Sequence, residues 1–152
     1  MAELLPPYSK EQLVHFFSPE DLPYDTLQHI ANMIDPEPLR FSANERIMVQ
    51  GEPGDGMYFI AQGSVEITQK PFGPGSPAPP VKIAELSAGD VVGEMALVNA
   101  EPRSATVTAL DGVMAYRLSI DSWRHIEAVY PALAARIREV AEMRAVELAS
   151  RG

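Results

Sequence analysis

The chain has 152 residues, no cysteine and a formal net charge of −9 at pH 7. This length suits a single domain, and the lack of cysteine excludes disulfide frameworks, thiolate zinc sites and cysteine nucleophiles. The acidic balance argues against nucleic acid as a partner, because the chain would repel a phosphate backbone.

The N-terminus begins "MAELLPPYSK", which has neither the basic nor the apolar region of a secretory signal. No apolar run in the chain approaches the roughly 18 to 20 residues needed to cross a bilayer. We therefore expect a cytoplasmic chain without a membrane span.

Residues 1–35 predict a helical segment. Ser9 is a suitable N-cap for the run "KEQLVHFF", and Ser18 followed by Pro19 is a helix-start pattern. The second helix would carry an apolar stripe of Leu27, Ile30, Ala31 and Ile34. Pro36 and Pro38 would end it.

Residues 36–119 predict strands. Short apolar runs are separated by Gly, Pro, Asp and Ser turns, which is typical of an antiparallel sandwich or barrel. The segment Lys70 to Pro80 is too rich in proline and glycine to pair, and we expect a flexible hairpin tip there. The runs are "RIMVQ", "MYFIA", "SVEIT", "VKIAEL", "ATVTA" and "VMAYRLS".

Residues 120–152 return to a helical period. "DSWRHIEAVY" predicts a short helix, and Pro131 begins another that would run to about Ser150. Its stripe is Leu133, Ile137, Val140, Arg144 and Leu148, so an arginine lies on the face expected to pack inward.

The stretch "GEMALVNAEPRSATV", from Gly93 to Val107, holds the one basic residue between Lys82 and Arg117, namely Arg103. We expect a short helix starting near Gly93, whose first turn offers unpaired N–H groups to an anion. Arg103 could donate two parallel hydrogen bonds to phosphate oxygens, and Glu94 could accept hydrogen bonds from sugar hydroxyls. Together these features favour a phosphorylated sugar.

This stretch resembles the phosphate-binding cassette of the cyclic nucleotide-binding domain family, whose members include the catabolite activator protein, protein kinase A regulatory subunits and cyclic nucleotide-modulated channels. The resemblance extends to "GEPGDGMYFIAQGSVEI", "LSAGDVVGE" and "YPALAARIREVAEMR", and so covers about residues 35–148. It implies a mainly β fold: an antiparallel jelly-roll barrel with N-terminal helices and two C-terminal helices. Val92 departs from the family, which usually has Phe there.

The resemblance also implies roles for cassette residues. Glu94, with the Gly93 backbone, would hold the ribose 2′-hydroxyl. Arg103 would hold the cyclic phosphate with the backbone amides of Ala96 and Ser104, and Met95 belongs to the same cassette. A structural salt bridge from Arg103 to Glu94 or Glu101 is the alternative that needs no ligand.

Outside the cassette, the resemblance implies contacts with the base. Ile67, Ala84 and Leu86 would line the purine side, although plain core packing also accounts for them. Arg144 and Leu148 match a lid helix that closes over the base, and Arg144 could instead snorkel to water. The lid arginine favours cAMP, whereas a hydroxyl at Ser104 could favour cGMP.

The expected function is a cyclic nucleotide sensor, not an enzyme, that needs no cofactor. Its three histidines, His15, His29 and His125, lie outside the strands, where a cupin-type metal site would need them. An effector protein or a linked effector domain is the expected partner. The alternative is a ligand-free barrel of the same fold that acts as a dimerisation or interaction module.

Overall fold

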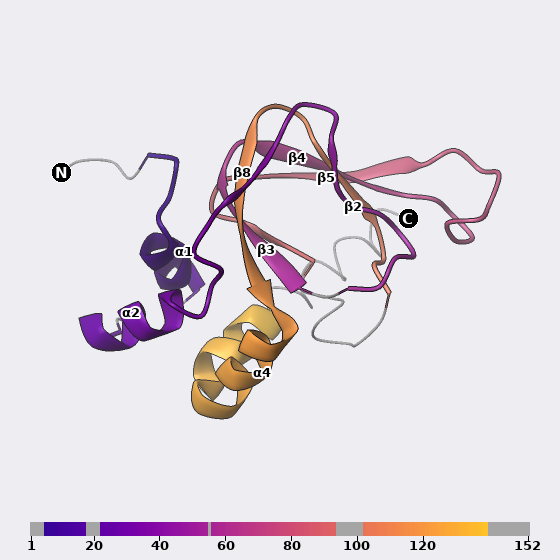
Figure 1. Ribbon diagram of the computed structural model, residues 1–152. Coiled ribbons are helices and arrows are strands. Elements are labelled where there is room, and N and C mark those ends of the chain that lie inside the picture. Colours follow the sequence, from indigo (N-terminus) through magenta and orange to yellow (C-terminus); the bar gives the residue numbers. More distant parts are fainter. Residues whose placement is uncertain (1–4, 18–21, 55, 94–101, 140–152) are drawn as a thin grey trace.

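The computed structural model describes residues 5–17, 22–54, 56–93 and 102–139. Its helices lie together on one side of two sheets, and the loop between β4 and β5 extends away from them (Figure 1). The elements, in chain order, are α1 (Lys10–Phe17), α2 (Tyr24–Ala31), β1 (Leu39–Phe41), β2 (Arg46–Met48), β3 (Gly56–Gln62), β4 (Ser64–Gln69), β5 (Val81–Ser87), β6 (Val91–Val92), β7 (Thr106–Ala109), β8 (Val113–Ser119) and α4 (Ile120–Val129), and residues 131–139 are also helical.

The strands form two four-stranded sheets, ordered β1-β8-β3-β6 and β2-β7-β4-β5. Every strand pairing within them is antiparallel. The predicted antiparallel jelly roll with flanking helices is confirmed, and its first strand begins at Leu39. Residues 70–80 connect β4 to β5 as the predicted hairpin loop.

Strand β3 separates the two hydrophobic cores of the molecule. Successive side chains of a strand point to opposite faces. Met57 and Phe59 therefore pack in the cluster shared with the helices, whereas Ile60 packs in the cluster between the sheets. Burial on both faces explains why β3 reads as a nearly continuous apolar run rather than an alternating one.

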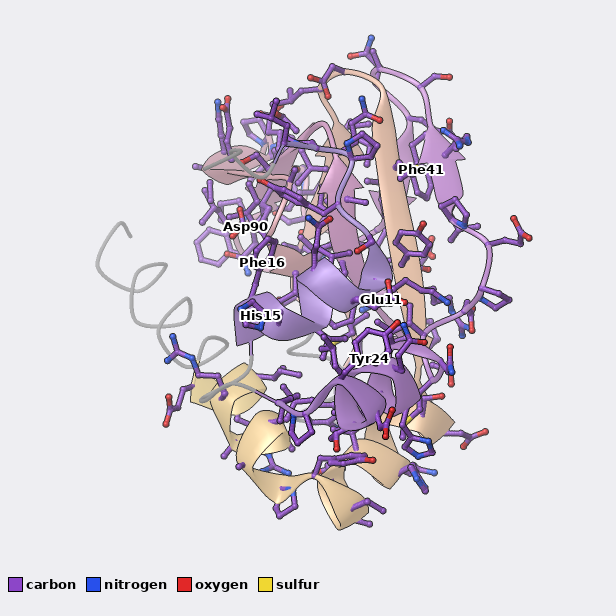
Figure 2. The ribbon with its side chains drawn as sticks, turned by 90° about the vertical axis from the view of Figure 1, so that its left-hand side faces the viewer. Glu11, His15, Phe16, Tyr24, Phe41 and Asp90 are labelled. Carbon is purple, nitrogen blue, oxygen red and sulfur yellow. The ribbon has the colours of Figure 1, made fainter. Side chains whose placement is uncertain are left out.

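Helix α1 begins with the predicted cap. The Ser9 hydroxyl accepts from the Gln12 amide at 3.1 Å, and the Gln12 side chain accepts from the Ser9 amide at 2.8 Å. This reciprocal pair satisfies two backbone donors at the helix start. The helix docks where the Tyr8 amide donates to the carbonyl of Ala61 at 2.9 Å. The rings of Tyr8 and Phe16 meet edge to face with centroids 5.0 Å apart, on the side of the molecule that Figure 2 shows.

Helix α2 begins at Tyr24, later than the predicted start at Ser18 and Pro19. Residues 18–21 lie outside the described residues. A second proline governs the observed boundary: Pro23 is extended, with φ −55° and ψ 146°, and it precedes the first helical residue. The predicted inward stripe is confirmed at Ile30, Ala31 and Ile34, which are buried.

The C-terminal helices contact each other through Arg138. Its guanidinium forms an ion pair with Glu127 of α4 and lies 5.7 Å from the ring centre of Trp123. Helix α4 is capped by the Ser119 hydroxyl, which accepts from the Ser122 amide at 3.2 Å. Leu133 and Ile137 are buried, as their stripe predicted, and the rest of that stripe lies outside the described residues.

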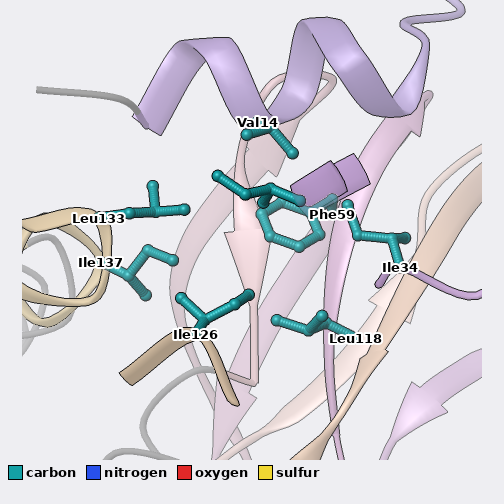
Figure 3. A pocket seen from close by; sticks show the side chains of 8 residues that line it. Val14, Ile34, Phe59, Leu118, Ile126, Leu133 and Ile137 are labelled. Carbon is teal, nitrogen blue, oxygen red and sulfur yellow. The ribbon is translucent and has the colours of Figure 1, made fainter. Parts of the chain in front are cut away.

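The N-terminal and C-terminal helices meet around one apolar gap of about 10 Å³ (Figure 3). Val14 of α1 and Ile126 of α4 line it together with Phe59 of β3. Such a gap can hold about one water, but its apolar walls offer water no partner. The two sets of helices therefore share a dry contact over the first sheet.

Candidate functional site

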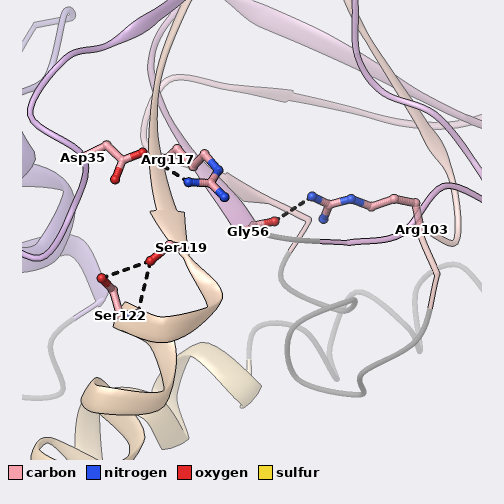
Figure 4. Close-up of polar contacts among 6 residues, drawn as sticks. All are labelled: Asp35, Gly56, Arg103, Arg117, Ser119 and Ser122. Carbon is pink, nitrogen blue, oxygen red and sulfur yellow. Dashed lines mark hydrogen bonds and ion pairs between the residues drawn. The ribbon is translucent and has the colours of Figure 1, made fainter.

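Among the residues that the structure describes, Arg103 is the one buried charged residue, with only 6% of its surface exposed. Its Nη2 donates to the carbonyl of Gly56 at 2.7 Å (Figure 4). Its Nη1 donates to the carbonyl of Gly93 at 3.0 Å. Arg103 takes part in a further interaction besides these two. Two carbonyls from separate strand ends thus fix the plane of the guanidinium.

The backbone of Arg103 is fixed as well. Its amide donates to the carbonyl of Glu52 at 2.8 Å, and its carbonyl accepts from the amide of Gly51 at 2.8 Å. These bonds tie the cassette at Arg103 to the loop between β2 and β3. A charged group held at both its backbone and its side chain is preorganised to receive an oppositely charged partner.

Position 93 requires a glycine because the Arg103 guanidinium lies against its backbone. It has φ +83°, and a Cβ placed on it would lie 2.5 Å from Arg103 Nη1 and 3.0 Å from the Met48 methyl carbon. The sequence interpretation gave this glycine a close approach to a ligand. In the structure its missing side chain makes room for the guanidinium.

The three residues predicted to line the purine side come together on sheet β2-β7-β4-β5. Ile67 lies opposite Ala84, and Leu86 lies opposite Val65. Residues directly opposite in an antiparallel pair share a face of the sheet. Since Val65 is fully buried between the sheets, and Ile67 and Leu86 pack against the same cluster, the shared face is the inner one. Contact with a base stays a prediction.

Ser104 is exposed, and its carbonyl accepts from the Gln69 side chain at 3.0 Å. Two residues on, the Thr106 hydroxyl accepts from the Gln50 amide at 3.0 Å. The residues that follow Arg103 are therefore held by β4 and by the loop after β2. These polar contacts position the backbone next to the guanidinium.

Several predicted site residues lie outside the described residues: Glu94, Met95, Ala96, Arg144 and Leu148, together with the short helix expected near Gly93. The roles assigned to them stay predictions. The same holds for the alternative in which Glu94 or Glu101 pairs with Arg103.

The sequence interpretation missed Gly56 and the segment Gly51–Glu52 as parts of this site. Their contributions are backbone carbonyl and amide groups, which leave no mark in side-chain chemistry. The available signal was the motif "GEPGDG", which was interpreted as a turn and as part of the family resemblance, without a contact to Arg103.

The described residues hold no cluster of three or more metal-ligating side chains. The closest juxtaposition of histidines there, His29 with His125, has ring centres 6.4 Å apart at the contact between α2 and α4. No helix in the described part of the chain is long and apolar enough to span a bilayer.

Comparison with known proteins matches the cyclic nucleotide-binding domain model to residues 38–128. The chain is 42% identical over 74 residues to a cAMP-dependent protein kinase regulatory subunit of Dictyostelium discoideum, which covers 49% of this chain and 22% of the relative. It is 36% identical over 107 residues to isozyme 1 of the cGMP-dependent protein kinase of Drosophila melanogaster, covering 70% of this chain and 13% of that one.

Among solved structures, the regulatory domain of Toxoplasma gondii protein kinase A, crystallised with cAMP, superposes with a TM-score of 0.71 at 29% identity. That match covers 91% of this chain and 48% of the other. The chain thus spans less than a quarter of the two curated relatives described. Because the family model matches more than half of its residues, the chain belongs to the cyclic nucleotide-binding domain family.

Proposed function

We propose that this domain binds cAMP and that Arg103 holds the cyclic phosphate. The observation that carries the proposal is the geometry of the guanidinium, which is buried and oriented by the carbonyls of Gly93 and Gly56. A planar guanidinium suits two oxygens of one phosphate, because its donors form a fork. Carbonyls that fix its plane remove the rotamer freedom that binding would otherwise cost.

The remaining cassette roles complete the proposed contact. Glu94 accepts from the ribose hydroxyl beside the Gly93 backbone, and the amides of Ala96 and Ser104 donate to the phosphate; Met95 belongs to the same segment. Ile67, Ala84 and Leu86 offer an apolar surface to the purine. The inner-face position of these three residues supports this part of the proposal.

We propose that three segments of the chain have different roles. Residues 36–119 hold the ligand, residues 120–152 form the lid, and residues 1–35 respond to the lid. Arg144 and Leu148 contact the base in this scheme. The apolar gap lined by Val14 and Leu133 supports the last step, because a shift of one set of helices there must be accommodated by the other.

The ligand shifts the lid toward a closed state only to the extent that it binds the closed state more tightly than the open one. The output is then a change in helix position that an effector protein or a linked domain reads. The lack of a catalytic role and the cytoplasmic location stay predictions from the sequence.

Paired calorimetric titrations with cAMP, cGMP and 5′-AMP test this function. We expect cAMP to bind at micromolar concentration or tighter, about −8 kcal/mol or better. We expect weaker binding of cGMP, and the weakest binding of 5′-AMP, which has no cyclic phosphate. Heat-silent titrations with unchanged NMR spectra would favour the interaction module instead, and a concentration-dependent dimer in sedimentation would then identify it.

A further inference from the structure

A groove of about 390 Å³ lies on the outer face of sheet β2-β7-β4-β5, away from the interior where Ile67 and Val107 are packed. Its floor is formed by the hydroxyl-bearing residues Thr68, Thr106 and Thr108. These threonines point outward because they alternate along their strands with the inward Ile67 and Val107. The groove therefore lies on the opposite face of the sheet from Ile67, one of the residues proposed to line the purine.

Two cations lie toward opposite ends of this groove. Arg46 lies opposite Thr108, which in turn lies opposite Glu66 of β4. Lys70 follows β4, four residues beyond Glu66, which places it about 13 Å further along the strand direction. Both Arg46 and Lys70 line the groove. A ligand lying across the threonines would thus meet a cation at each end.

The wall of the groove is held in place by hydrogen bonds. The Gln50 side chain accepts from the Lys70 amide at 2.8 Å and donates to the Lys70 carbonyl at 3.3 Å. Pro74 closes over Gly51, where a Cβ would lie 2.8 Å from the proline Cγ. The loop between β4 and β5 is thereby fastened to the loop after β2.

The charge at the groove is available to a ligand. In the part of the chain that the structure describes, neither Arg46 nor Lys70 forms an ion pair. Lys82, on the same sheet, differs: it pairs with Glu85, and that hydrogen bond, with the nearby charge of Glu66, raises the pKa of Lys82. Glu66 lies on the groove face of β4, with β7 between it and Arg46. Glu85 of β5 lies opposite Glu66 on the same face and is paired with Lys82.

The geometry points to a second ligand site, which takes a small polyol with an acidic group at each end, such as a sugar bisphosphate. Arg46 and Lys70 bind the two acidic ends. The hydroxyls of Thr68, Thr106 and Thr108 form hydrogen bonds with the hydroxyls of the polyol between those ends. This site is distinct from the proposed cyclic nucleotide contact, since none of its side chains is assigned a role in that contact; of its residues, Thr106 lies within the stretch Gly93–Val107.

Titration of the full chain with fructose 1,6-bisphosphate, followed by calorimetry and by amide NMR shifts, tests the site. We expect binding that weakens as salt is raised. Fructose 6-phosphate, with one acidic end, should bind at least tenfold more weakly, and fructose should not bind. Arg46→Gln and Lys70→Gln should each weaken binding at least tenfold, and Thr68→Val at least threefold.

Arg40→Gln is the matched control, because Arg40 is an exposed cation on the other sheet and does not line the groove. It should change the affinity less than twofold. Equal weakening by all the cation variants would mean diffuse charge attraction and would overturn the proposal. Binding that survives the groove variants but is lost in Arg103→Gln would place the sugar phosphate in the cassette, and would also overturn it. So would an absence of NMR shifts at millimolar ligand.

Discussion

Gly93 and Arg103 are matched in space: the guanidinium of Arg103 lies where a side chain on Gly93 would be, with Nη1 3.0 Å from the Gly93 carbonyl oxygen. The left-handed φ of +83° turns that carbonyl toward the guanidinium. Two residues ten positions apart therefore define one feature, the orientation of the cation.

Gly93→Ala should separate these two residues. A Cβ 2.5 Å from Nη1 forces the guanidinium to move, because the end of a long side chain yields more easily than backbone. We expect the Kd for cAMP to rise at least tenfold in calorimetry. Urea unfolding should show a stability loss of about 1 to 2 kcal/mol from the strained φ.

Gly73→Ala is its matched control. Gly73 has a similar φ of +96°, but a Cβ there would have nothing within 4 Å. It should cost comparable stability and leave the cAMP affinity unchanged. If Gly93→Ala binds cAMP as well as Gly73→Ala does, the orientation of Arg103 does not govern phosphate binding.

The apolar gap predicts energetic coupling between the N-terminal and C-terminal helices. Val14→Ala should cost about 2 kcal/mol and Leu133→Ala about 2 to 5 kcal/mol, since both remove buried methyl groups. Because both side chains line one gap, the double variant should depart from additivity by about 0.5 to 3 kcal/mol. Thermal and urea unfolding measure all three.

Val65 supplies the control for that cycle, since it is fully buried in the other core, between the sheets. Val65→Ala combined with Leu133→Ala should be additive to within about 0.5 kcal/mol. Additivity of the Val14 pair as well would show that the helices do not sense each other through this gap.

The lid proposal predicts slower amide exchange in residues 131–139 when cAMP is bound, measured by hydrogen–deuterium exchange. Arg144→Ala should reduce that slowing and weaken cAMP binding less than Arg103→Ala does. Arg136→Ala is the control, because Arg136 is an exposed arginine within the helical residues 131–139 and pairs with Glu139. Exchange that is identical with and without cAMP in the unaltered chain would reject the lid.

The sequence was sufficient for the elements whose signals are local. The Ser9 cap and the inward Ile30 follow from capping and periodicity, which act over a few residues. The start of α2 was predicted too early because two prolines, Pro19 and Pro23, carry the same local signal. Local preference does not decide between two such starts.

The candidate site also contains residues that the sequence could predict and residues that it could not. Arg103 could be predicted because it is the single cation in its stretch of sequence. Its carbonyl partner Gly56 could not, because that contact joins residues 47 positions apart through backbone atoms. The groove between Arg46 and Lys70 was missed for a related reason: strand register brings its parts together, and the spacing of residues along the chain does not record register.

Calorimetric titration of cAMP into the unaltered chain and into Arg103→Ala tests the central claim most directly. Removing the guanidinium should weaken binding by about 2 to 5 kcal/mol, as when one partner of a buried charged pair is truncated. That loss corresponds to roughly 30-fold to 5,000-fold in Kd. A folded Arg103→Ala chain that loses less than tenfold would contradict the claim, because the phosphate would then be bound elsewhere.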